Sequence, residues 1–79
     1  MSKADVEKDI SIIPDTVDAC IELAAKHLPE GYEIVITVEN GGYGASLRAP
    51  DYTSIYLGGG HDMRSDIIDG IRISNGLYR

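Results

Sequence analysis

The sequence lacks several features that would point to particular protein classes. It has no tryptophan and no phenylalanine, so Ile, Leu, Val and five tyrosines must build the core. It has one cysteine, Cys20, which excludes an intramolecular disulfide and favours a reducing, cytosolic setting. Apolar runs are only a few residues long, so we expect no membrane-spanning helix. Residues 1–10 are too polar for a signal peptide.

Basic residues are also scarce. Seven Lys and Arg against thirteen Asp and Glu give a net charge of −6, which argues against a nucleic-acid or anionic-membrane binder, because such a binder needs a basic patch. The composition is 43% apolar and 25% charged, which is typical of a folded chain and not of a disordered one. A length of 79 residues fits one small domain.

The first fourteen residues carry no clear pattern. Residues 1–9 read as a charged tail that is either frayed or adds a helical turn. Ile10, Ile12 and Ile13 follow as a short strand or as an apolar lead-in to the next helix. We therefore expect a tail and lead-in over residues 1–14 and a single domain over residues 15–79.

The spacing of apolar residues predicts a helix over residues 15–28. Asp15 is the expected N-cap, and Pro29 ends the helix. Lys26 and His27 fall in the last turn, where cations suit the helix dipole. The expected apolar face consists of Val17, Ile21, Ala24 and Leu28, widened by Cys20 and Leu23.

Three strands follow, each separated by turn-forming residues. Residues 32–39 alternate in polarity, and Asn40-Gly41-Gly42 predicts a hairpin to a return strand through Leu47. Ala49-Pro50-Asp51 predicts a second turn, and residues 52–57 a third strand. In that strand we expect one face toward the core and the other toward solvent. The core face would hold Thr53, Ile55 and Leu57, and the solvent face Tyr52 and Tyr56.

The chain is expected to end in a second helix. Asp62 is its predicted cap, Gly70 would allow close approach to the sheet, and Asn75-Gly76 would stop it. A small hairpin is the alternative, because Ile71-Arg72-Ile73 is β-like and Asn-Gly also forms hairpin turns. The predicted fold class is α+β in the order α-β-β-β-α, with a three-stranded antiparallel meander and two helices on one face.

No residue set indicates catalysis, a metal or a cofactor. The triple glycine at 58–60 lies before a helix but lacks the Lys and Ser/Thr of a phosphate-binding loop. His61 and Asp62 have serines nearby but no nucleophile elbow. Cys20 and His27 are two helical turns apart, about 10 Å, which is too far for one zinc ion. We therefore expect a protein that is not an enzyme and holds neither metal nor cofactor.

The acidic residues form rows that could contact a partner. Neighbours in a helical row lie about 5–6 Å apart, which is comparable with phosphate spacing along a nucleic-acid strand. A solvated face that keeps a small protein soluble is the alternative explanation. Tyr52 and Tyr56 are possible anchors, although they could equally be ordinary cross-strand pairs. The rows are Asp15, Asp18 and Glu22 in the first helix, Glu33 and Glu39 in the first strand, and Asp62, Asp66 and Asp69 in the second helix.

Two resemblances bear on function. The α-β-β-β-α order over residues 15–77 resembles the double-stranded RNA-binding domain, which binds through a basic cluster at the start of its second helix. Here that stretch is His61-Asp62-Met63-Arg64-Ser65-Asp66, so RNA binding is not implied. In size, charge and missing catalytic motifs the chain resembles the small phage-encoded anti-CRISPR inhibitors. That class shares no motif, so no site residue carries over.

The anti-CRISPR resemblance implies a partner and a place of action. The partner would be a basic nucleic-acid-binding protein or complex such as a CRISPR effector, met in the cytoplasm of a bacterial host, with no direct contact to nucleic acid or membrane. The main alternative is a structural or assembly protein that works by self-association, as a homodimer for example, since a three-stranded sheet has exposed edges. A small enzyme or ligand-binding domain is the third possibility.

Overall fold

The computed structural model describes residues 3–58 and 62–77. It confirms the mixed α+β class and the strand order, and it adds a helix at the start of the chain. The elements in chain order are α1 (Lys3–Ile12), α2 (Val17–His27), β1 (Glu33–Glu39), β2 (Gly42–Arg48), β3 (Ser54–Tyr56) and α3 (Met63–Ser74).

The three strands form an antiparallel sheet in the order β1-β2-β3. The expected hairpin joins β1 to β2, with Glu39 opposite Gly42 and Gly41 in the left-handed region at φ 100°. Leu47 is fully buried and pairs with Ile34 on one side and Ile55 on the other, which fixes the face that points to the helices.

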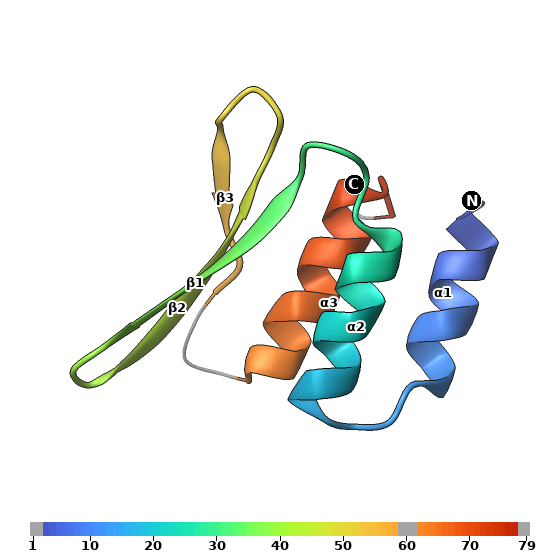
Figure 1. Ribbon diagram of the computed structural model, residues 1–79, viewed down its shortest axis with the longest axis horizontal. Helices are drawn as coiled ribbons and strands as arrows, with labels where there is room; N and C mark the ends of the chain where they lie inside the picture. Colours follow the sequence, from blue (N-terminus) through green and yellow to red (C-terminus); the bar gives the residue numbers. More distant parts are fainter. Residues whose placement is uncertain (1–2, 59–61, 78–79) are drawn as a thin grey trace.

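The elements stack in layers, as Figure 1 shows. The sheet forms one outer layer, α2 and α3 lie side by side in the middle, and α1 lies on the far side of that helix pair. The tip of the β1–β2 hairpin leans away from the helices (Figure 1), which explains why Val38 is 74% exposed although it follows the core-facing alternation of Ile34 and Ile36. In the described part of the chain, helices cover one face of the sheet and leave the other open.

Two apolar clusters hold these layers together. The first lies among the three helices and is built around Val6, Cys20, Leu23, Ala24, Ile67 and Ile71. The second lies between sheet and helices and is built around Ala45, Leu47 and Leu57. Ile34, Ile36 and Leu28 contact both clusters, so the two form a continuous core.

The start of the chain differs from the expected tail. Residues 3–12 form α1, and its Val6 is 1% exposed. Glu7 accepts hydrogen bonds from Arg72 of α3, and Asp9 bonds to Lys26 and His27 of α2. The sequence pattern was ambiguous because, among the side chains of α1 whose burial is described, only Val6 is deeply buried, and its partners are distant in the chain.

The helix caps confirm one expectation and correct another. Asp62 caps α3, since its Oδ1 accepts a hydrogen bond from the Arg64 amide at 2.9 Å. The cap of α2 is Thr16 and not Asp15, because the Thr16 hydroxyl accepts from the Ala19 amide at 3.1 Å. Asp15 instead binds Arg64, so this carboxylate ties the start of α2 to the start of α3.

The C-terminal segment is a helix, so the hairpin alternative is wrong. The Asn75 side chain donates to the Ile71 and His27 carbonyls, at 2.8 and 3.1 Å, and thereby links the ends of α3 and α2. Gly70 permits close approach as expected, since a Cβ there would lie 2.9 Å from the Ile34 Cδ1 atom. The third strand is shorter than predicted and spans Ser54–Tyr56. Tyr52 lies in the preceding turn, where its amide donates to the Ala49 carbonyl at 2.9 Å.

Candidate protein-docking surface

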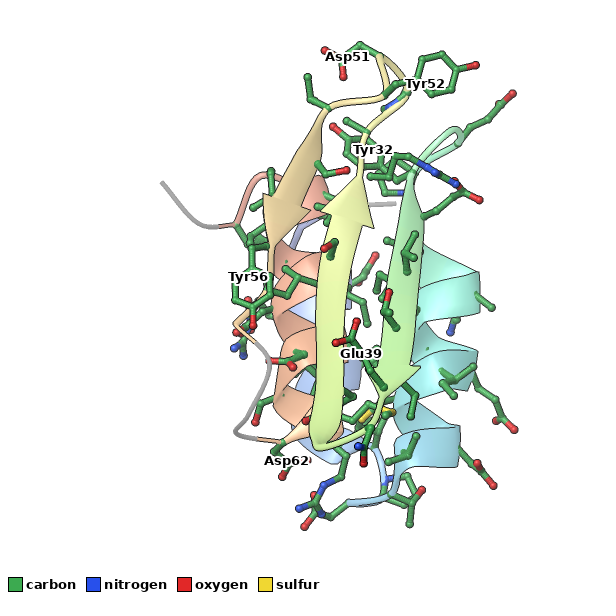
Figure 2. The ribbon with its side chains drawn as sticks, turned by 90° about the vertical axis from the view of Figure 1, so that its left-hand side faces the viewer. Tyr32, Glu39, Asp51, Tyr52, Tyr56 and Asp62 are labelled. Carbon is green, nitrogen blue, oxygen red and sulfur yellow. The ribbon has the colours of Figure 1, made fainter. Side chains whose placement is uncertain are left out.

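The sheet face opposite the helices is open in the described part of the chain (Figure 2). Because Ala45 and Leu47 point to the helices, the alternate β2 positions 42, 44, 46 and 48 lie on the open face. Their register partners on β1 are Glu33, Val35, Thr37 and Glu39, all exposed. Tyr56 of β3 pairs with Ser46 and is 68% exposed on the same face. The face therefore combines carboxylates with one large aromatic ring.

A shallow hollow of about 510 Å³ lies on this face along the β1–β2 hairpin. Gly42 and Gly44 form its floor, since neither has a side chain on the open face. A Cβ on Gly44 would lie 3.8 Å from the Tyr56 Cε1 atom, so the ring borders that floor. Glu39 and Thr37 form the opposite border. A partner's arginine could lie flat here against Tyr56 with its guanidinium near the Glu39 carboxylate.

The two predicted β1 carboxylates differ in availability. Glu33 accepts a hydrogen bond from Arg48 Nε at 2.6 Å and pairs with its Nη2 as well, so part of its charge is neutralised within the sheet. Glu39 makes no ion pair with any described residue and is exposed. Of the two carboxylates, Glu39 is thus the stronger candidate to bind a basic group of a partner.

The two predicted tyrosine anchors do not share a face. Tyr56 lies on the open face beside the hollow, whereas Tyr52 lies at the β2–β3 turn (Figure 2) with 84% of its surface exposed. The backbone of Tyr52 has φ 71°, a left-handed conformation that is unfavourable for a residue with a Cβ. The strand prediction failed here because Ala49-Pro50-Asp51 extends its turn by one residue, with Asp51 Oδ1 accepting from the Thr53 amide.

The acidic row of α2 is only partly available. Asp18 and Glu22 are exposed and make no ion pair within the described residues. Asp15 binds Arg64 Nη1 at 2.7 Å, although 88% of its side chain remains accessible. This row thus presents two free carboxylates beside a third whose charge is offset.

The predicted acidic row of α3 is not a surface row. Asp66 is 2% exposed, so it cannot meet a docking partner in this structure. Asp62 is held by its capping bond and by Arg64, whose hydrogen bonds keep the pKa of this carboxyl below its usual value. Asp69 is half-buried and makes a further interaction. Helical spacing places these residues in one row, but that row turns partly toward the protein interior.

The hollow, and a second depression between α2 and β1, were not predicted from the sequence. Gly42 and Gly44 alternate on one face of a strand, and glycine in a strand interior often marks a place where another group approaches the backbone closely. These two glycines could therefore have predicted the hollow from the sequence. The depression was not predictable, because its size depends on how far α2 stands from the sheet.

Two buried groups that can ionise, His27 and Cys20, lie in the helical part of the core. His27 is 5% exposed, and its Nε2 lies 2.8 Å from Asp9 Oδ2. Hydrogen bonds from His27 and Lys26 lower the pKa of Asp9. Burial raises the pKa of the Cys20 thiol, so this group is less available as a thiolate. His61, which precedes the cap residue Asp62 in the sequence, lies outside the described residues.

Within residues 3–58 and 62–77, no three His, Cys, Asp or Glu side chains lie close enough to hold a metal ion. The helices in that same range are too short and too polar to cross a bilayer. No protein-family model matches the sequence, and neither the curated proteins nor the solved structures contain a match.

Proposed function

We propose that this protein is a non-enzymatic inhibitor that docks an acidic surface on the basic nucleic-acid-binding surface of another protein. The most specific form of the proposal is an anti-CRISPR protein that occupies the nucleic-acid groove of a CRISPR effector complex. The observation that carries it is the uncovered sheet face, where Glu39 and the exposed Tyr56 border a glycine-floored hollow.

The physical basis is complementary charge. A net charge of −6 attracts a basic groove and speeds encounter, and the same attraction weakens as salt screens it. Tyr56 offers a large rigid contact area at low entropic cost, which suits an anchor at the centre of an interface. Carboxylates without partners, such as Glu39, have no internal ion pair to lose on binding.

The test uses purified type I and type II CRISPR effector complexes loaded with guide RNA. Target-DNA binding is measured with and without the protein, at low and at high salt. We expect one effector type to lose DNA binding at low salt and to recover as salt rises. If neither effector binds the protein or loses DNA binding, the anti-CRISPR proposal is wrong.

Single substitutions identify the contact surface. Glu39→Lys and Tyr56→Ala on the open face should each weaken inhibition by about tenfold or more, as anchor residues do. Glu30→Lys is the matched control, because Glu30 is exposed, makes no ion pair among described residues and precedes β1 at the end opposite Glu39. Equal inhibition by all three variants would contradict docking through the open face.

A further inference from the structure

We propose that the outer edge of β1, with the groove beside it, binds an extended strand of the target protein in which apolar residues alternate with basic ones. The inference deepens the proposed function and rests on it, because the strand belongs to the docking partner. It concerns a different surface from the hollow, namely the side of the molecule where α2 meets β1.

The first observation is that β1 is an edge strand. The sheet order is β1-β2-β3, so within the described residues no strand pairs with the outer side of β1. The Leu57 amide donates to the Ala45 carbonyl at 2.8 Å, so Ala45 directs its backbone groups toward β3. Its register partner Ile36 therefore directs its own N–H and C=O outward, and alternation adds Ile34 and Val38. An added strand would satisfy these groups.

The second observation is an apolar groove of about 420 Å³ next to this edge, on the helix side of the sheet. Ile21 and Ala25 of α2 form one wall, Ile34 and Ile36 of β1 form the other, and Ile67 of α3 lies between them. Ile21 is 50% exposed, so the wall is not sealed. Side chains on one face of an added strand would enter this groove, and they must be apolar to match it.

The third observation is the charge around the groove. Asp18 and Glu22 are exposed on α2, within one helical turn of the groove residues Ile21 and Ala25. On the open face, Glu39 lies at one end of β1. No described cation is paired with these three carboxylates. Residues of the added strand that alternate with the apolar ones would lie on the open face beside Glu39, so basic side chains fit best there, while Asp18 and Glu22 add negative potential on the helix side.

The same charges disfavour a second copy of this chain as the occupant. If two β1 strands pair antiparallel about Ile36, Glu33 of each lies directly opposite Glu39 of the other. The helices of both copies would then lie on the same face of the joined sheet. The exposed carboxylates Asp18 and Glu22 of one copy would therefore face those of the other. Each copy carries a net charge of −6, which adds repulsion between the two.

The experiment uses the full chain and a synthetic peptide of about eight residues in which Val and Lys alternate. Binding is followed through the backbone amide shifts and hydrogen exchange of the protein. We expect shifts concentrated on β1 and α2, with slower exchange at Ile34, Ile36 and Val38. A peptide of the same sequence with N-methylated amides on one edge controls for nonspecific attraction to an acidic protein, and it should bind about tenfold more weakly.

Protein variants then test whether the groove itself contributes to peptide binding. Ile21→Gln removes apolar surface from the groove wall and should weaken peptide binding by about tenfold. Ile12→Gln is the matched control, because Ile12 is another exposed helical isoleucine, 69% exposed and on α1, and this variant should bind as the wild type does. Circular dichroism confirms that both variants remain folded.

Several outcomes would overturn the inference. Equal binding of the methylated and unmethylated peptides would show that binding does not depend on main-chain hydrogen bonds to β1. Unchanged binding to Ile21→Gln would exclude the groove. Sedimentation that shows a dimer dissociated by Ile21→Gln would identify a second copy as the occupant. The proposed function is tested separately. If Glu39→Lys weakens inhibition of an effector and Ile21→Gln does not, docking through the open face is supported and binding of a partner strand at β1 is refuted.

Discussion

At the scale of single residues, Tyr52 is the most unusual position in the structure. A left-handed backbone costs an L-residue about 1–2 kcal/mol, and Tyr52 recovers little of this through packing because 84% of its surface is exposed. A side chain kept under those conditions is a reasonable candidate for contact with a partner, as the sequence suggested for a different reason.

The strain at Tyr52 can be measured directly. We expect Tyr52→Gly to raise the free energy of unfolding by about 0.5–1 kcal/mol, since glycine adopts this conformation without a Cβ penalty but is more flexible when unfolded. Tyr52→Ala is the control, because it removes the side chain and keeps the Cβ, so its stability should match the wild type. Urea denaturation measures both, and a destabilised Tyr52→Gly would show that the ring has a packing role.

Cys20 provides a probe of the helical core. Its side chain is 2% exposed and burial raises the pKa of its thiol, so both access and thiolate formation are suppressed in the folded state. We expect a thiol reagent to modify the native protein far more slowly than the chain unfolded in urea. As Cys20 is the single thiol of the sequence, the reaction is unambiguous. Equal rates in the two conditions would mean that the cluster among the helices is open.

At the scale of elements, α1 is the main difference between expectation and structure. Its charged residues pair with α2 and α3, and Val6 enters the cluster among the three helices. The segment looked like a tail because charge pairing across distant positions leaves no periodic pattern. Strongly patterned elements were predictable, among them the β1–β2 hairpin with its Asn-Gly turn and the helix that follows Asp62.

The contribution of α1 can be tested by truncating one side chain. Val6→Ala should lower the free energy of unfolding by about 2 kcal/mol, because it leaves a cavity at a position that is 1% exposed. Ile12→Ala, in the same helix but 69% exposed, should change stability by less than about 0.5 kcal/mol. Chemical denaturation of both variants measures this difference. Equal small effects would indicate that α1 contributes nothing to the core.

The acidic rows show why a surface is harder to predict than a helix. Spacing placed Asp62, Asp66 and Asp69 in one row, but the direction of that row depends on how α3 meets the sheet and α2. The structure turns Asp66 inward, while Asp18 of α2 stays exposed. The packing of the helices therefore decides which acidic residues face solvent, and spacing along the sequence does not predict it.

At the scale of the whole molecule, carboxylates couple folding to pH. The pKa values of Asp9, Asp51 and Asp62 are lowered in the folded state, chiefly by side-chain hydrogen bonds from His27, Thr53 and Arg64 respectively. The folded protein therefore binds fewer protons than the unfolded chain, where these groups titrate near 3.8. Their stabilisation is present above that pH and is lost as the pH falls through the folded values.

We accordingly expect the urea midpoint to fall steadily from pH 5 to pH 2. Asp9→Asn should lower the midpoint at neutral pH and make the decline with acid shallower, because one of the three groups no longer titrates. Denaturation curves at several pH values measure both effects. A midpoint that rises with acid would mean that repulsion among the acidic residues outweighs these hydrogen bonds.

The two faces of the sheet divide the chain into parts with separate constraints. The buried side chains of the core lie on the helix side of the sheet. The open face carries exposed residues, namely Glu33, Val35, Thr37, Glu39 and Tyr56. Substitutions on the open face can therefore change what the protein recognises at little cost in folding. A protein built in this way can follow a changing partner through successive generations while its scaffold stays the same.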